Sequence, residues 1–140
     1  RIPPKLASRS VQEILEYGRD DTGWRVGSET ASGRGARGAL RVEFGDGYVV
    51  GSTDLAAGNW HHIAYRFIGG EKADVASHVH LFVDGKPETV SDFRPATVRE
   101  GRAGDLTLGS SEISGLDGWI DEVHFFDEAI PTPAIQELAK

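Results

Sequence analysis

Short runs in which hydrophobic and polar residues alternate recur along most of the chain, separated by turns that contain glycine. Residues 39–44 alternate in this way and are followed by Asp46-Gly47, a dipeptide favoured in two-residue hairpin turns. Residues 60–67 have the same period of two. Because successive side chains of a strand point to opposite faces, each run predicts a strand with two distinct faces.

The remaining runs predict a series of antiparallel hairpins with a short helix at the end. The predicted strands are residues 12–18, 23–27, 39–44, 48–50, 60–67, 78–83, 105–109 and 118–126. Thr132-Pro133 predicts a helix start with Thr132 as the N-cap, and the helix continues to about residue 139. Residues 1–10 contain Pro3-Pro4 and predict an extended lead-in. These elements together predict an all-β sandwich that forms a single domain over residues 1–140.

Composition excludes several classes of function. The net charge of −7 argues against a nucleic-acid partner, since affinity for phosphate backbones comes from basic patches. The chain has no cysteine, so disulfides, thiolate zinc sites and a cysteine nucleophile are absent. No run approaches the 18 apolar residues of a membrane-spanning helix. The chain begins at Arg1 without an initiator methionine, and we expect it to be a fragment of a larger protein.

Four motifs resemble those of laminin-G-like (LamG) domains in the concanavalin A-like lectin/glucanase superfamily. They are Gly58-Asn59-Trp60-His61-His62-Ile63-Ala64, Phe82-Val83-Asp84-Gly85-Lys86, Leu106-Thr107-Leu108-Gly109 and Gly118-Trp119-Ile120-Asp121-Glu122-Val123. The resemblance spans about residues 14–138 and implies an antiparallel two-sheet jelly-roll sandwich with a short C-terminal helix. Trp60 and Trp119 head two strands at motif positions, and we expect both to be buried as structural core anchors.

The chain departs from this resemblance at its N-terminus. Members of the family begin with several strands before the stretch that matches Ile14, and these strands have no counterpart here. A sandwich that lacked them would expose an open edge. We therefore expect the N-terminal strands to be missing or supplied elsewhere, by a second fragment or by a homo-oligomer that completes the sandwich.

The resemblance implies a non-catalytic binding module that recognises an extracellular glycan or protein. Such modules belong to larger secreted or membrane-anchored bacterial proteins, for example as the outward domain of a FecR-type anti-sigma regulator. This places the expected location outside the cell or in the periplasm. Two alternatives remain open: an accessory or catalytic domain of a polysaccharide-degrading glycoside hydrolase, and a purely structural assembly domain.

Catalysis is not expected from the sequence. The β-glucanases of this superfamily carry Glu-x-Asp-x-x-Glu on one strand, which places the acids on one face. Residues 121–128 lack that arrangement, and Asp121 and Asp127 would lie about 20 Å apart along a strand at 3.3 Å per residue. No nucleophile-elbow, zinc-protease or phosphate-loop motif occurs.

Candidate ligand residues come from the acidic and aromatic positions. The resemblance implies that Asp121 and Glu122 can ligate calcium, an ion that requires six to eight oxygens. The alternative is a capped strand end. Trp24, Tyr48 and Tyr17 lie near predicted loops and are candidates for stacking on a sugar ring, or else for partial burial under the glycine-rich loop at residues 32–38.

The five histidines give only weak metal signals. His61 and His62 are adjacent, so on a strand they point to opposite faces and cannot bind one ion together. His78 and His80 share a face and could bind zinc together with a cross-strand carboxylate, but a lone His-x-His is a weak signal and favours a cross-strand polar pair. Residues 32–38, 69–77 and 92–104 are poor in strand formers and are predicted to be specificity-bearing loops.

Overall fold

The computed structural model describes residues 11–18, 22–31, 33–99, 104–109 and 115–140. The predicted lead-in at residues 1–10 lies outside the described residues. The strands are β1 (Val11–Tyr17), β2 (Trp24–Glu29), β3 (Leu40–Phe44), β4 (Gly47–Val50), β5 (Ile63–Phe67), β6 (Val79–Val83), β7 (Lys86–Pro87), β8 (Asp92–Arg94) and β9 (Leu106–Leu108). The helices are the 3₁₀ turn η1 (Leu55–Ala57), α1 (Val75–His78) and α2 (Thr132–Leu138).

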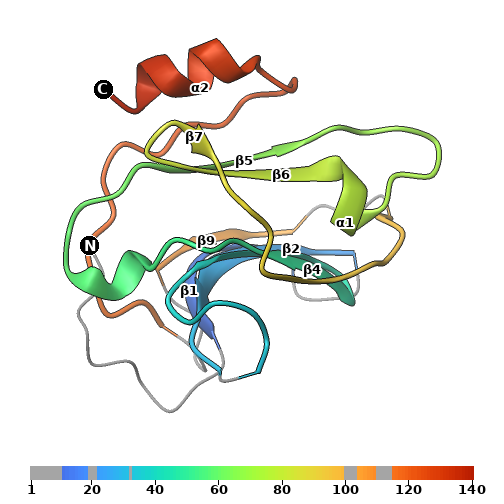
Figure 1. The fold of residues 1–140 in the computed structure, drawn as a ribbon. Coiled ribbons are helices and arrows are strands. Elements are labelled where there is room, and N and C mark those ends of the chain that lie inside the picture. Colours follow the sequence, from blue (N-terminus) through green and yellow to red (C-terminus); the bar gives the residue numbers. More distant parts are fainter. Residues whose placement is uncertain (1–10, 19–21, 32, 100–103, 110–114) are drawn as a thin grey trace.

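The strands form two antiparallel sheets that stack face to face (Figure 1). The large sheet has six strands in the order β8-β4-β3-β2-β1-β9, and the small sheet has three in the order β5-β6-β7. The neighbours β4 and β8, and β1 and β9, are far apart in sequence. The structure therefore confirms the predicted all-β, two-sheet sandwich with a short C-terminal helix.

The core lies between the two sheets and is built from the side chains that point inward, which are every second residue along each strand. The large sheet contributes Val26, Leu40, Val42 and Val49, and the small sheet contributes Val79, Leu81 and Val83. An aromatic cluster continues this core beyond Val26. In that cluster Trp24 lies 5.8 Å from Tyr65, and Phe44 lies 5.3 Å from Phe67, measured between ring centroids. Burial raises the pKa of Tyr65 to about 12.

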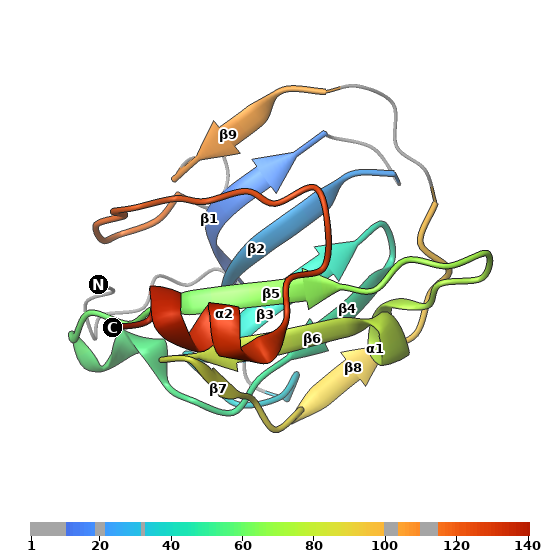
Figure 2. The same ribbon diagram turned by 90° about the horizontal axis from the view of Figure 1, so that it is seen from above.

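Helix α2 covers the outer face of the small sheet (Figures 1 and 2). Phe82 points to that face of β6 and is only 1% exposed, and Ile135 of the helix is 2% exposed. Arg66 holds the segment before the helix, because its Nη1 donates to the carbonyl oxygen of Ile130 at 3.2 Å. The N-cap is Pro131, one residue before the predicted Thr132, and it makes no side-chain cap hydrogen bond.

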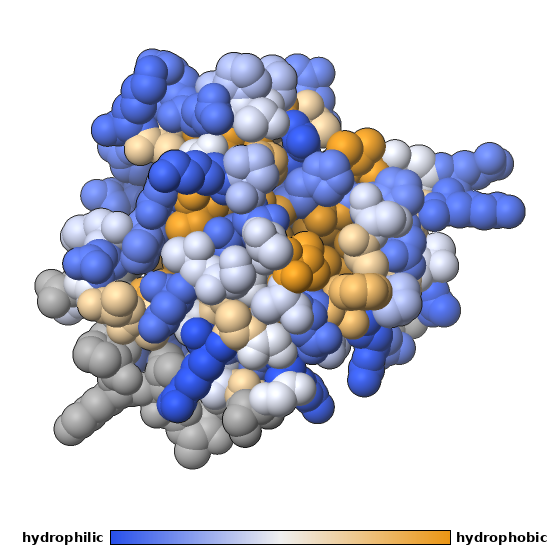
Figure 3. All heavy atoms as spheres, viewed as in Figure 1, coloured by the Kyte–Doolittle hydropathy of each residue, from blue (hydrophilic) through white to orange (hydrophobic). Residues whose placement is uncertain are grey.

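The face that carries β7 and β8 shows apolar side chains in the band between the two layers (Figure 3). Val90, which precedes β8, is 43% exposed, and Phe93, which lies on β8, is 55% exposed. Polar side chains cover the helix and loops seen from this side. None of the described helices is long and apolar enough to cross a membrane.

Several predicted elements are wrong. Trp60 and Trp119, predicted as buried core anchors, are 59% and 62% exposed. Trp60 lies three positions before the first residue of β5, so it is outside the region in which the two sheets pack against each other. Residues 118–126, predicted as a strong strand, run without strand pairing, and Trp119 lies within them. Residues 92–94 and 75–77, predicted as loop, lie in β8 and α1, and His78, predicted to begin a strand, ends α1.

Candidate functional site

A row of polar side chains crosses the outer face of the large sheet. The strand register places Glu16 opposite Arg25, Arg25 opposite Glu43, Glu43 opposite Tyr48 and Tyr48 opposite Arg94. Directly paired residues lie on the same face of a sheet, so these five side chains form one line across β1, β2, β3, β4 and β8. We call this line the outer row. From Glu16 to Glu43 it alternates carboxylates with a guanidinium group, and it ends in the Tyr48 hydroxyl and Arg94.

The members of the outer row are held in place by their neighbours. Arg25 Nε lies 3.1 Å from Glu43 Oε2, and the Tyr48 hydroxyl donates to Asp92 Oδ2 at 3.0 Å. The guanidinium carbons of Arg41 and Arg94 lie 3.9 and 5.8 Å from the centroid of the Tyr48 ring. Cations over an aromatic face are favourable, so Tyr48 is fixed by both its ring and its hydroxyl.

A buried ion pair lies beside the outer row. The Arg41 side chain is paired with Glu29, which is completely buried, and with Glu43 of the outer row. Buried charges in proteins are paired, because an isolated one would lose its hydration without compensation. The pair with Glu29 therefore holds the Arg41 guanidinium in place, and Arg41 in turn contacts Glu43 and the ring of Tyr48.

The glycine-rich loop at residues 33–38 packs over the far end of the same face. The backbone N–H of Ala31 donates to Glu29 Oε1 at 2.8 Å, and that of Ala36 donates to Ser91 Oγ at 2.9 Å. Gly35 has a φ of +86°, and a Cβ there would come within about 3 Å of Ser91, Asp92 and Val50. Only glycine fits this approach. The loop leaves Arg34 and Arg37 exposed beside the polar face.

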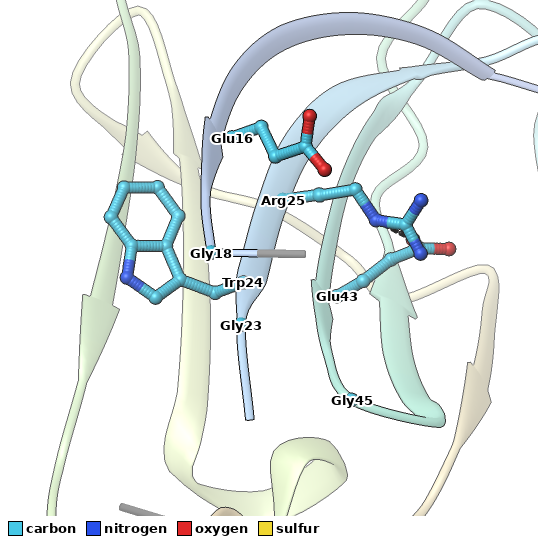
Figure 4. Close-up of a pocket in the computed structure, with 7 residues that line it drawn as sticks. All are labelled: Glu16, Gly18, Gly23, Trp24, Arg25, Glu43 and Gly45. Carbon is cyan, nitrogen blue, oxygen red and sulfur yellow. Dashed lines mark ion pairs between the residues drawn. The ribbon is translucent and has the colours of Figure 1, made fainter. Parts of the chain in front are cut away.

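A small pocket opens at the β1–β2 end of the outer row (Figure 4). Its lining residues are Glu16, Gly18, Gly23, Trp24, Arg25, Glu43 and Gly45. Figure 4 shows the Arg25–Glu43 ion pair and Glu16 on one side of the strands and the Trp24 ring on the other. The volume of about 60 Å³ holds a few waters but no sugar ring. A larger ligand would therefore bind across the face rather than inside a cavity.

The three aromatic residues predicted as ligand-binding do not form one site. Tyr17 and Trp24 stack on each other with ring centroids 5.8 Å apart, on the inner face beside the core. Tyr48 lies on the outer face, where it is part of the outer row. The structure therefore separates Tyr48 from Trp24 and Tyr17.

The predicted calcium ligands Asp121 and Glu122 are exposed on the segment at residues 118–126, which forms no strand. The backbone N–H of Glu122 donates to Asp121 Oδ1 at 3.0 Å, and Glu122 has a φ of 51°. Among the residues that the structure describes, no group of three or more His, Cys, Asp or Glu is placed to hold a metal ion. Calcium binding by these two carboxylates stays a prediction.

A histidine–carboxylate cluster at the start of the small sheet was not foreseen. His61 Nδ1 lies 2.9 Å from Asp84 Oδ2, and the backbone N–H of His62 donates to Asp84 Oδ1 at 3.0 Å. The pairing of β5 with β6 and the Asp84-Gly85 turn bring these residues together. His80 forms the predicted cross-strand polar pair, since its Nδ1 lies 3.2 Å from Nη2 of Arg66 on the neighbouring strand, whereas His78 ends α1.

This cluster has two shifted pKa values. Burial lowers the pKa of His62 below its ordinary 6.5, His124 lowers it further, and Asp84 opposes the shift. Burial alone would raise the pKa of Asp84. The hydrogen bonds and positive charge of His61 and His62 outweigh burial and hold it below 3.8.

We predict that acid destabilises the domain in two windows. Below pH 6.5 the unfolded chain protonates at His62 before the folded one does, so stability falls as pH drops through this range. As pH falls below 3.8, Asp84 becomes protonated in the unfolded chain before it does in the folded one. The stability that the Asp84 carboxylate contributes is therefore lost as pH falls further, through the lower pKa that this group has in the folded domain. Urea unfolding across a pH series measures both effects.

Two variants serve as controls for the acid windows. His62→Gln should flatten the window below 6.5, and Asp84→Asn should flatten the lower one. Variants whose pH dependence matches that of the unmodified domain in both windows would disprove the assignment.

Comparison with known proteins agrees with this architecture. Neither the curated proteins nor the solved structures gave a match to the chain. A laminin-G family model described as "Concanavalin A-like lectin/glucanases superfamily" matches residues 4–136, which is nearly the whole sequence. The two stacked antiparallel sheets are those expected of this family. The chain therefore belongs to the concanavalin A-like lectin/glucanases superfamily.

Proposed function

We propose that this domain is a non-catalytic module that binds an extracellular glycan on the outer row. The observation that supports it most is the unbroken line of charged and hydroxyl side chains across five neighbouring strands. A sugar carries hydroxyl groups that both donate and accept, so it matches a surface of alternating carboxylates and guanidinium groups. The ion pairs hold those groups in position before the ligand arrives, which lowers the entropic cost of binding.

A row of polar side chains can also be an ordinary solvated outer face without a ligand, which many antiparallel sheets have. Two features favour a ligand. Tyr48 is fixed at its ring by guanidinium groups and at its hydroxyl by Asp92, although an exposed face needs no such order. The glycine-rich loop also brings Arg34 and Arg37 to the same end of the molecule as Asp92.

The module is proposed to serve a larger secreted or membrane-anchored bacterial protein, outside the cell or in the periplasm. A regulator of the FecR type is one example. This part of the proposal is supported by the resemblance of the sequence motifs to laminin-G-like domains of larger secreted or surface-anchored proteins. A protein ligand is the alternative within the same class of function.

A glycan array, followed by calorimetry on the tightest ligand, tests the proposal. We predict that Arg25→Ala combined with Arg94→Ala weakens binding at least about tenfold, since each hydrogen bond to a charged group contributes about 1.5–3 kcal/mol. Lys86→Ala, an exposed change on β7 of the other sheet, should leave affinity unchanged. A domain that binds no glycan, or binds one equally well after the double substitution, would contradict the proposal.

Two further measurements test calcium binding and catalysis. If Asp121 and Glu122 bind calcium that assists the glycan, then chelator and the pair Asp121→Asn and Glu122→Gln should weaken binding to the same extent. An assay on β-glucans with the unmodified domain should release no product. Product that disappears in the Asp121→Asn and Glu122→Gln variants would make the domain a glycoside hydrolase instead.

A further inference from the structure

We propose a second binding surface: the open edge of the small sheet accepts an extended, positively charged strand from another polypeptide, inserted between β5 and residues 120–129. This surface is separate from the outer row, which lies on the far side of the large sheet. The inference therefore does not depend on glycan binding.

One side of the slot is the unpaired edge of β5. The carbonyl of His62 accepts from Asp84 N–H at 2.8 Å, and Ile68 N–H donates to the carbonyl of His78 at 2.8 Å. Backbone groups alternate in direction along a strand, so the even-numbered residues of β5 face β6. The N–H and C=O groups of Ile63, Tyr65 and Phe67 then face the other way, where the described residues provide no strand.

The other side of the slot is the segment at residues 120–129. It contains Val123, Phe125 and Phe126, strand formers whose order predicted a strand. No backbone-to-backbone hydrogen bond joins residues 120–129 to any other described residue. Glu122 has a φ of 51° and its N–H is bonded to Asp121, so the part that can act as a template for another strand is residues 123–129.

The two sides run alongside each other in the same direction. His124 is near enough to His62 to lower its pKa, and Ile130 accepts a hydrogen bond from Arg66 at 3.2 Å. The order 62 to 66 therefore follows the order 124 to 130. Figure 2 shows the same course: the orange-to-red segment before α2 passes beside β5 and over the large sheet.

Apolar side chains around the slot lack a cover. Leu106 and Leu108 of β9 pair with Tyr17 and Leu15, so they face the inner side of the large sheet. They are nevertheless 45% and 52% exposed, because three strands cannot cover the inner face of six. Phe125 is 57% exposed on the facing segment. Apolar groups gathered in this way on a soluble domain mark an interaction site.

The charge around the slot selects the occupant. Residues 115–130 carry five acidic side chains, Asp117, Asp121, Glu122, Asp127 and Glu128, and the cation that reaches this segment from β5 is the single arginine Arg66. A second copy would bring the same negative charge to the interface, and the whole chain carries −7. A strand with alternating apolar and basic residues instead satisfies the unpaired backbone, covers the leucines and neutralises the acids.

The test uses a blocked octapeptide of alternating lysine and valine, titrated into the full chain by calorimetry. We expect one peptide to bind per domain, at least about tenfold more tightly than a glutamate–valine peptide, with affinity falling as salt rises. A lysine–valine peptide with N-methylated backbone should not bind, because it cannot complete the hydrogen bonds. Phe125→Ser should weaken binding about tenfold or more, whereas Phe93→Ser, equally exposed on β8, should not.

Each other outcome overturns the proposal. Equal affinity for the two peptide charges, binding of the methylated peptide, or no binding at all would mean that no cationic strand is selected. Elution as a dimer that dissociates on Phe125→Ser would assign the surface to a second copy. Equal losses in Phe125→Ser and Phe93→Ser would indicate non-specific adsorption to apolar residues.

Discussion

Replacing Phe82 with alanine is expected to destabilise the domain by about 3–5 kcal/mol, the usual cost of removing a buried aromatic side chain. Phe82 is 1% exposed and alternates with the core residues Leu81 and Val83, so it lies on the outer face of β6. Helix α2 covers that face of the small sheet (Figure 1). Its loss would leave a cavity under Ile135, which is itself buried. Helix α2 would then lose apolar packing beneath it, while the Arg66 hydrogen bonds to Ile130 and Thr132 remain. Urea unfolding followed by circular dichroism measures the change.

Trp60→Ala is the matched control, because the residue is larger but 59% exposed. Exposed side chains usually change stability by about 0.5 kcal/mol or less when replaced. The prediction from sequence, a buried anchor, would have given Trp60→Ala the larger effect. A loss for Trp60→Ala that equals the loss for Phe82→Ala would restore that first interpretation and contradict the structure.

Arg41→Ala is expected to cost about 3–5 kcal/mol, because it leaves the buried carboxylate of Glu29 without its partner. Arg25→Ala removes an arginine on the same face that is 46% exposed and pairs with Glu43 at 3.1 Å and with the buried Glu13 at 3.6 Å. Solvent screens the exposed Arg25 guanidinium, so this change should cost less than Arg41→Ala. The two arginines thus compare a fully buried cation with a half-exposed one.

A double variant tests whether the cost comes from the unpaired charge. Arg41→Met together with Glu29→Gln removes both charges, and it should be more stable than Arg41→Met alone. If the double variant loses the sum of the two single losses, then Arg41 stabilises the sheet by packing on Tyr48 rather than by pairing with Glu29.

Much of the fold could be predicted from the sequence because its hairpins are local. The Asp46-Gly47 and Asp84-Gly85 turns fix β3–β4 and β6–β7, and alternation fixes which residues face the core. Residues 118–126 show the limit of this reasoning. Val123, Phe125 and Phe126 favour a strand, but a strand also requires a neighbour, and the described residues supply none. The residue types of this segment therefore predicted a strand that the structure does not form.

The candidate site could be predicted only in part. Trp24 lies two positions from Val26, so the sequence alone could have placed it on the inner face. The outer row could not be predicted from the sequence, because it depends on the pairing of β8 with β4, whose residues are more than 40 positions apart in the chain. The same holds for the exposure of Leu106 and Leu108, which follows from the different widths of the two sheets.

The two proposed surfaces suit a module that joins a ligand to a partner protein. The outer row offers ordered polar groups on one face of the large sheet. The slot beside β5 offers backbone hydrogen bonds and apolar side chains on the opposite side of that sheet. Filling the slot would add a strand to the small sheet and cover part of the core, so binding there should also raise stability.

Amide hydrogen exchange along β5 in the free domain tests the open sandwich most directly. The account predicts an alternating pattern: slow exchange at Ala64, Arg66 and Ile68, which face β6, and exchange at least about a hundredfold faster at Ile63, Tyr65 and Phe67. Uniformly slow exchange would show that this edge is already paired and would contradict the account.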